Sequence, residues 1–130
     1  MAYPPARVPT QQVVSYLRKG FTFSDNGSVL VLGTIPAGAL IIKPMSGVMV
    51  TTVFNAGSTN VLDIGTTADD DLFGTDLALG TAAFVPLDEA IGGYAVAADT
   101  TLTATPALSG TAATTGAGEI VICYVADLDG

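Results

Sequence analysis

The sequence has no histidine and no tryptophan, and Cys123 is its only cysteine. Without histidine the chain cannot build a serine–histidine triad, a histidine metal site or histidine acid–base catalysis. One cysteine excludes a disulfide within the chain, and Cys123 stands among Val, Ile and Tyr rather than among the cations that favour a reactive thiolate. These absences predict a protein that is not an enzyme and binds no cofactor.

Ionic side chains are also scarce. Charged residues make up 12% of the chain, against about 25% in an average soluble domain. Four basic residues face twelve acidic ones, the net charge is −8, and no basic residue follows Lys43. Because phosphates repel an acidic body, direct nucleic-acid binding is not expected. Residues such as Pro36, Gly38 and Pro44 interrupt every apolar stretch before about 18 residues, so no membrane partner is expected either.

Short β-branched apolar stretches, divided by glycine, proline and asparagine, fill residues 28–66. Turn signals recur about every ten residues, a spacing typical of β-sandwiches and jelly rolls. The pattern predicts an all-β fold, an antiparallel β-sandwich or jelly roll. The expected strands are Val13–Arg18, a short strand with Phe21 and Phe23 on one face, Val29–Leu32, Ala39–Lys43, Val48–Phe54, Val61–Ile64, Tyr94–Ala98, Thr101–Thr105, which Pro106 ends, and Glu119–Val125.

Two further segments, residues 1–12 and 107–118, are expected to contact a neighbour. Three prolines among the first nine residues favour an extended, polyproline-like arm over residues 1–12, followed by a single β-sandwich domain over 13–130. Residues 107–118 form a Gly/Ala/Thr-rich stretch that is expected to be a loop. The residues predicted to contact a partner lie in the arm and in this loop: Tyr3, Pro4, Pro5, Arg7, Val8, Pro9, Ala107, Leu108, Thr111 and Thr114.

Residues 66–79 break the strand pattern. Thr67 or Asp69 has a side chain suited to cap a helix, and Asp70 and Asp71 would lie favourably near its positive end. One short helical turn is therefore expected here. The same aspartates have the oxygen ligands that calcium prefers, but their spacing does not match an EF-hand loop. A solvated helix start is the favoured interpretation, no metal site is predicted, and calcium at a subunit interface stays open.

Asp63-Ile64-Gly65 has some similarity to the Asp-Thr/Ser-Gly loop of aspartic proteases. The middle residue is isoleucine, where those enzymes carry a small hydroxyl residue. A strand that ends at a turn explains the same three residues, so no catalytic role is assigned to Asp63.

The last predicted strand, Glu119–Val125, is apolar on both faces. Ile120, Ile122 and Tyr124 alternate with Val121, Cys123 and Val125. A strand with this pattern is expected to be covered on both sides. Either a helix or another subunit must therefore cover the face that is turned away from the core.

Taken together, the proline-rich start, the strands around Ile35-Pro36-Ala37-Gly38, the stretch Val61–Gly65 and the aspartate-rich turn resemble the jelly-roll or β-sandwich decoration (cement) proteins of tailed-bacteriophage capsids. The resemblance covers roughly residues 20–75 and 119–126 and contains no diagnostic motif. It implies a structural virion protein on the capsid exterior, assembled in the host cytoplasm. Its implied partners are the major capsid protein, whose contacts it would stabilise, and copies of itself in a dimer or trimer.

The alternative is a head-fibre or tail component with the same fold that binds host-surface carbohydrate. Sugar sites usually offer aromatic platforms. This chain has no tryptophan and only four tyrosines, which counts against the carbohydrate hypothesis.

Overall fold

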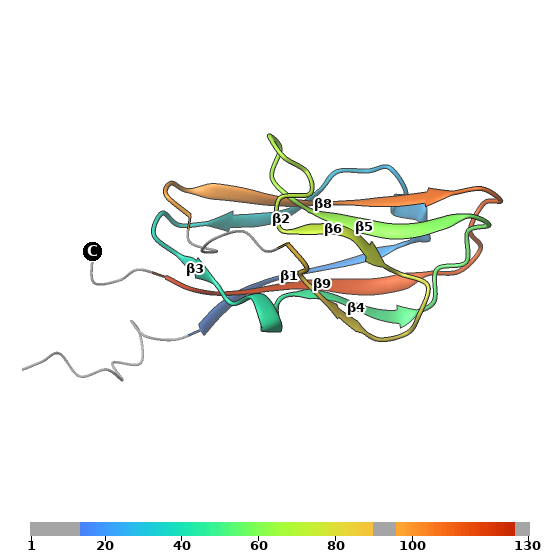
Figure 1. The fold of residues 1–130 in the computed structure, drawn as a ribbon, viewed down its shortest axis with the longest axis horizontal. Coiled ribbons are helices and arrows are strands. Elements are labelled where there is room, and N and C mark those ends of the chain that lie inside the picture. The colour runs from blue at the N-terminus through green and yellow to red at the C-terminus, as the bar shows by residue number, and fades with distance from the viewer. Residues whose placement is uncertain (1–13, 90–95, 127–130) are drawn as a thin grey trace, which may run out of the picture.

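Two antiparallel β-sheets lie one above the other (Figure 1) in the computed structural model, which describes residues 14–89 and 96–126. This architecture confirms the predicted β-sandwich. Sheet A has the order β1-β9-β4-β7, with β3 also paired to β9, and contains β1 (Val14–Thr22), β3 (Leu40–Ile41), β4 (Gly47–Thr52), β7 (Phe84–Pro86) and β9 (Ala117–Val125). Sheet B has the order β2-β8-β5-β6 and contains β2 (Leu30–Ile35), β8 (Thr100–Ser109), β5 (Thr59–Gly65) and β6 (Gly74–Ala78).

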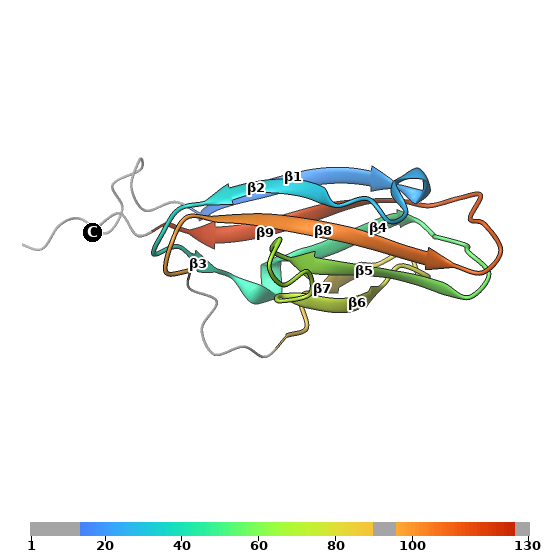
Figure 2. The same ribbon diagram turned by 90° about the horizontal axis from the view of Figure 1, so that it is seen from above.

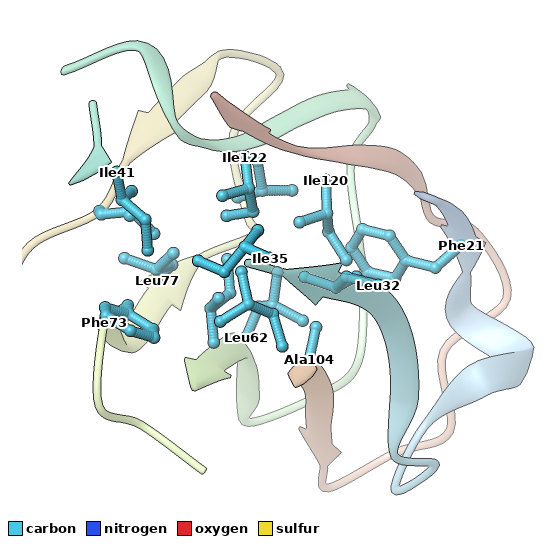
Figure 3. Packing of buried hydrophobic residues seen from close by; sticks show 14 of the residues in the cluster. Phe21, Leu32, Ile35, Ile41, Leu62, Phe73, Leu77, Ala104, Ile120 and Ile122 are labelled. Atoms are coloured by element: carbon cyan, nitrogen blue, oxygen red, sulfur yellow. The ribbon is translucent and has the colours of Figure 1, made fainter. Parts of the chain in front are cut away.

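One apolar core fills the space between the sheets. Alternate residues of each strand point inward, as period-two geometry requires, and Figure 3 shows Ile120 and Ile122 of β9 near Ile35 and Leu62 of sheet B. All four of these side chains are essentially without solvent exposure. The sandwich is therefore stabilised mainly by side chains that come from strands far apart in the sequence.

Pro106 does not end its strand, which is a correction to the sequence prediction. β8 continues to Ser109, so Ala107 and Leu108 are strand residues and not part of a loop. The neighbouring strand β2 begins at Leu30, opposite Ala104, so it does not reach Pro106. On that side the Pro106 carbonyl accepts from the Gly27 amide at 2.9 Å. Because the missing proline N–H falls where β2 is absent, no ladder hydrogen bond is lost.

The short helical turn expected within residues 66–79 is absent there. The chain turns back at Thr66, whose amide donates to the Asp69 carbonyl at 2.8 Å, and then enters β6. β6 pairs with β5, with Leu62 opposite Leu77. Pairing with an existing strand therefore outweighs the local capping signal.

Two short 3₁₀ turns occur elsewhere, η1 (Phe23–Asp25) and η2 (Lys43–Met45). η1 follows β1 and is held by a capping box: the Thr22 amide donates to Asp25 Oδ2 at 2.9 Å, and Thr22 Oγ1 accepts from the Ser24 amide at 3.3 Å. η2 contains Pro44 near its start, where a proline is tolerated. Among the described residues, no helix has the length and apolar character that a membrane crossing needs.

Gly116 leaves room for a stacked pair of aromatic rings in the core. Phe21 and Phe54 stack with ring centroids 5.3 Å apart. Gly116 has φ of +148°, and a Cβ on this residue would lie 2.4 Å from a ring atom of Phe54. Any side chain here would have to push a fully buried ring aside.

We predict that Gly116→Ala lowers the free energy of unfolding by about 2–4 kcal/mol, from backbone strain and overpacking together. Gly80→Ala is the matched control, because a Cβ there meets no atom within 4 Å and its φ lies outside the glycine-favouring region. Urea unfolding of both variants measures the difference. Equal stability of the two variants would contradict this account of Gly116.

Candidate subunit interface

The outward side of sheet A carries a row of exposed apolar side chains, which we call the apolar face. The strand register puts these residues on the side away from the core, because each shares a face with Glu119, Cys123 or Val125 of β9. Its most exposed members and their exposed fractions are Tyr16 (59%), Val14 (51%), Leu40 (45%), Met49 (42%) and Phe84 (37%).

Register also brings these residues together across strands. Val14 and Leu40 both pair with Val125, so three apolar side chains lie side by side over β1, β9 and β3. At the other end of the face, Met49 of β4 pairs with Phe84 of β7. An apolar hollow of about 350 Å³ adjoins this second group, lined by Lys43, Pro44, Phe84, Pro86 and Leu87.

β9 shows why this face is apolar. Its inward residues Ile120 and Ile122 are buried, whereas the outward residues Val121 and Val125 are only half-buried. The sequence predicts that a helix or another subunit covers this side. Within residues 14–89 and 96–126 the helical elements are two three-residue turns, too short to cover a sheet. The described structure therefore leaves the apolar face without the cover that the pattern of β9 requires.

One ion pair crosses the apolar face. Arg18 Nε of β1 donates to Glu119 Oε1 of β9 at 2.8 Å, and Arg18 Nη2 contacts the same oxygen. The hydrogen bond and the charge of Glu119 raise the pKa of Arg18 above its already high ordinary value. Both groups are exposed, so the pair contributes little to stability. Its effect is to neutralise the carboxylate that the face carries.

The outward side of sheet B carries more hydroxyl groups than that of sheet A. Thr101, Thr103 and Thr105 of β8 point outward, and Thr101 Oγ1 lies 2.8 Å from Thr34 Oγ1 of β2. The turn at residues 66–70 lies over this side beside Thr103, which is 1% exposed. Val31 is an exposed apolar residue of this side. Val29, which lines the hollow beside this turn with Thr103 and Thr105, is exposed as well, so the outward side of sheet B combines hydroxyl groups with two exposed valines.

Charge follows the same division. The described cations are in or beside sheet A, with Arg18 and Lys19 in β1 and Lys43 in η2. Among the acidic residues within 14–89 and 96–126, only Glu119 belongs to a strand of sheet A. The others lie in sheet B or in turns and loops: Asp25, Asp63, Asp69, Asp70, Asp71, Asp76, Asp88, Glu89 and Asp99.

The aspartates over sheet B form a local cluster. Carboxylate oxygens of Asp69, Asp70 and Asp71 lie within 4.8 Å of one another. A hydrogen bond with Asp69 raises the pKa of Asp71. Asp63 points outward from β5 and accepts from the Asp76 amide at 2.8 Å, and partial burial raises its pKa. The arrangement is that of a solvated acidic turn, and a strand residue explains Asp63 without catalysis.

The predicted contact residues fall in three places. Thr111 and Thr114 lie in the loop between β8 and β9, at residues 110–116. This loop is tied to the loop at residues 53–58, since Thr114 Oγ1 accepts from Asn55 Nδ2 at 2.9 Å and the Thr111 carbonyl accepts from the Gly57 amide at 2.8 Å. Ala107 and Leu108 belong to β8. The arm residues Tyr3, Pro4, Pro5, Arg7, Val8 and Pro9 lie outside the described residues.

The apolar face itself was not among the predicted contacts. The sequence holds one signal for it, the apolar residues on both sides of Glu119–Val125. Tyr16, Leu40, Met49 and Phe84 join that signal only through the strand register. A reader of the sequence alone cannot know which strands flank β9.

Asp63→Asn is predicted to stabilise the protein most at neutral pH, with a gain that shrinks as the pH falls. The folded protein raises the pKa of Asp63 above its ordinary value of about 3.9 mainly because burial disfavours the charged carboxylate. The wild type therefore recovers stability as Asp63 becomes protonated below its folded-state pKa. The amide oxygen of asparagine can still accept from the Asp76 amide.

Urea unfolding of wild type and Asp63→Asn across the acidic pH range measures this difference. Because burial and not repulsion is the largest cause, the difference should persist at high ionic strength. A stability difference that is independent of pH would contradict the assignment.

No protein-family model matches the chain, and no curated protein matches it in sequence. Among solved structures, it is similar to a chain of "Cyanophage Pam1 capsid asymmetric unit", with a TM-score of 0.66 and 17% identity over 98% of this chain and 93% of that chain. It is also similar to a chain of "Acidic stable capsid structure of Helicobacter pylori bacteriophage KHP30", with a TM-score of 0.62 and 18% identity over 88% and 90% of the two chains. The chain therefore shares its fold, over nearly its whole length, with chains found in two phage capsids.

Proposed function

We propose that this protein is a structural component of a phage virion that binds the outer surface of the capsid and stabilises contacts between major capsid subunits, as a decoration protein does. The observation that carries the proposal is the fold likeness to chains of two phage capsids, which extends over nine-tenths or more of each of those chains. Because the coverage is nearly complete in both directions, those chains are close to this one in length.

The physical character of the chain supports a structural role. Its two sheets enclose one apolar core, charged residues are few, and it has no histidine, the residue that acts most often as a general acid or base. Decoration requires only a complementary surface. Many copies on a symmetric lattice bind with avidity, so each single contact can be weak.

The proposed partners are the major capsid protein and further copies of this chain, as a dimer or trimer on the capsid exterior. The proposed assembly site is the host cytoplasm, where new shells form. Residues 1–12 add a second contact, since a proline-rich extended segment loses little conformational entropy when it binds. This segment would contact a neighbouring capsid subunit or a second copy.

Binding to shells that lack the protein tests the proposal. We expect the purified protein to sediment with such shells, to saturate at a fixed ratio, and to raise the temperature at which the shells fall apart, because a ligand that binds only the intact state stabilises it. Light scattering on the free protein measures its oligomeric state. A protein that stays in the supernatant at all concentrations would refute capsid binding, and glycan-array binding would then favour the carbohydrate alternative.

The arm is tested by substitution at apolar positions. We expect Tyr3→Ser with Val8→Ser in one chain to weaken shell binding, because both remove apolar contact area. Thr10→Ser with Gln12→Ser is the matched control, since it changes the same segment at polar positions. Equal shell affinity of the two double variants would exclude the arm as a contact.

A further inference from the structure

We infer that the aspartate turn over sheet B and the buried hydroxyl of Thr103 beneath it form a binding site for one calcium ion. The turn spans residues 66–71 and carries Asp69, Asp70 and Asp71. It is the yellow-green loop that rises from sheet B in Figure 1. Such a site is a property of the single subunit and does not depend on the proposed function.

The three carboxylates are close enough to bind the same ion. One oxygen from each of Asp69, Asp70 and Asp71 lies within 4.8 Å of the other two. Calcium binds its oxygen ligands at about 2.3–2.6 Å, so two ligands on opposite sides of one ion lie about 5 Å apart. The three oxygens therefore fit within one calcium coordination shell.

The compensation that the sequence predicts for these carboxylates does not form. The helical turn whose positive end would favour Asp70 and Asp71 is absent from residues 66–79. Within the described chain, no basic residue belongs to the turn or to a strand of sheet B. A hydrogen bond joins the carboxyl groups of Asp69 and Asp71 and raises the pKa of Asp71. Two carboxylates this close repel each other unless a proton or a cation lies between them.

An independent observation is the buried hydroxyl below the turn. Thr103 is on the outward side of β8 and yet almost fully buried. No hydrogen bond among residues 14–89 and 96–126 involves its side chain. Together with Asp69 and Asp70, it lines a hollow of about 420 Å³. Because a buried hydroxyl without a partner is disfavoured, it indicates that a ligand binds in the hollow that the carboxylates line.

The hollow has the ligand chemistry of a calcium site. Six of its eight lining residues have a side-chain oxygen: Thr66, Thr67, Asp69, Asp70, Thr103 and Thr105. Calcium accepts an irregular shell of carboxylate, neutral oxygen and water ligands, whereas magnesium requires a smaller and nearly ideal octahedron. Consecutive aspartates of one turn and a threonine of one strand form an irregular shell, which favours calcium.

Gly65 explains why the turn lies over Thr103. The two residues are partners across the ladder between β5 and β8. A Cβ on Gly65 would lie 2.2 Å from the Asp69 carbonyl oxygen and 2.6 Å from the Asp70 carbonyl carbon. The backbone of the turn therefore rests on a strand position that has no side chain, directly beside Thr103. The carboxylates are thus held over the hydroxyl before any ion binds, which lowers the entropic cost of binding.

Calorimetric titration of the chelator-treated protein with calcium chloride, at physiological ionic strength, tests the site. We expect one ion per subunit with a Kd of about 10⁻⁴ M, and magnesium binding that is about tenfold weaker or more. Calcium should also raise the unfolding temperature, because it binds the folded state. Absence of calcium binding at millimolar concentration would overturn the site.

Three variants locate the bound ion. Asp70→Asn removes a charged ligand, and Thr103→Val removes the hydroxyl but keeps the shape of the side chain. We expect each to weaken calcium binding by about tenfold or more. Glu119→Gln is the matched control, because it removes a carboxylate charge on the outward side of sheet A and should change the Kd by less than about twofold.

Urea unfolding of the metal-free protein gives a second readout for Thr103. Because the hydroxyl has no partner there, Thr103→Val should be at least as stable as the wild type in chelator. Added calcium should then stabilise the wild type more than the variant. A Thr103→Val protein that is less stable in chelator would show that the hydroxyl has a partner within the protein, and would overturn the site.

The remaining outcomes are also decisive. Wild-type calcium affinity of Thr103→Val would reduce the turn to a diffuse attraction for counterions and overturn the site. Equal weakening by Glu119→Gln and Asp70→Asn would do the same, because the effect would then follow net charge and not position. None of these results bears on capsid binding, which sedimentation with shells measures separately.

Discussion

The structure depends on β9, a strand that is apolar on both sides and lies inside sheet A between β1 and β4. Its inner side chains Ile120 and Ile122 are fully buried, and burying an isoleucine contributes about 1.5–3 kcal/mol. Its outer side chains Val121 and Val125 stay half-buried because no described element covers them. The fold thus uses one side of β9 for its own stability and leaves the other available for association.

A buried serine allows β9 to change partners along its length. On one side of β9, β3 pairs with Val125 and Tyr124, and β4 pairs with the residues from Val121 back to Ala117. Ile122 and Cys123 therefore face a gap between the two strands. Ser46 Oγ fills this gap, since it accepts from the Cys123 amide at 2.9 Å and donates to the Ile42 carbonyl at 2.8 Å. An unsatisfied buried amide would cost about 1–3 kcal/mol. The gap also accommodates η2, which brings Lys43 to the border of the apolar face.

The sequence predicts the sandwich well where the alternation is strong and long. Strands close to Val29–Leu32, Val48–Phe54, Val61–Ile64 and Glu119–Val125 are present, with ends shifted by a few residues. β6 and β7 are missed because they are short and owe their pairing to β5 and β4, which no local pattern reveals. Pro106 wrongly predicts the end of a strand for the same reason. A proline is tolerated at this position of β8 because the neighbouring strand β2 begins opposite Ala104 and does not reach it. The apolar face is a property of register across five strands, so only the β9 part of it can be read from the sequence.

Charge is divided unequally between the two sides of the sandwich. With a net charge of −8, free copies repel one another, and repulsion between acidic surfaces keeps a protein with an exposed apolar face in solution. The acids that supply this repulsion lie mainly away from sheet A, so they need not be desolvated when the apolar face is covered. An apolar side and an acidic side can therefore coexist in one sandwich, because covering sheet A leaves most of the carboxylates in contact with water.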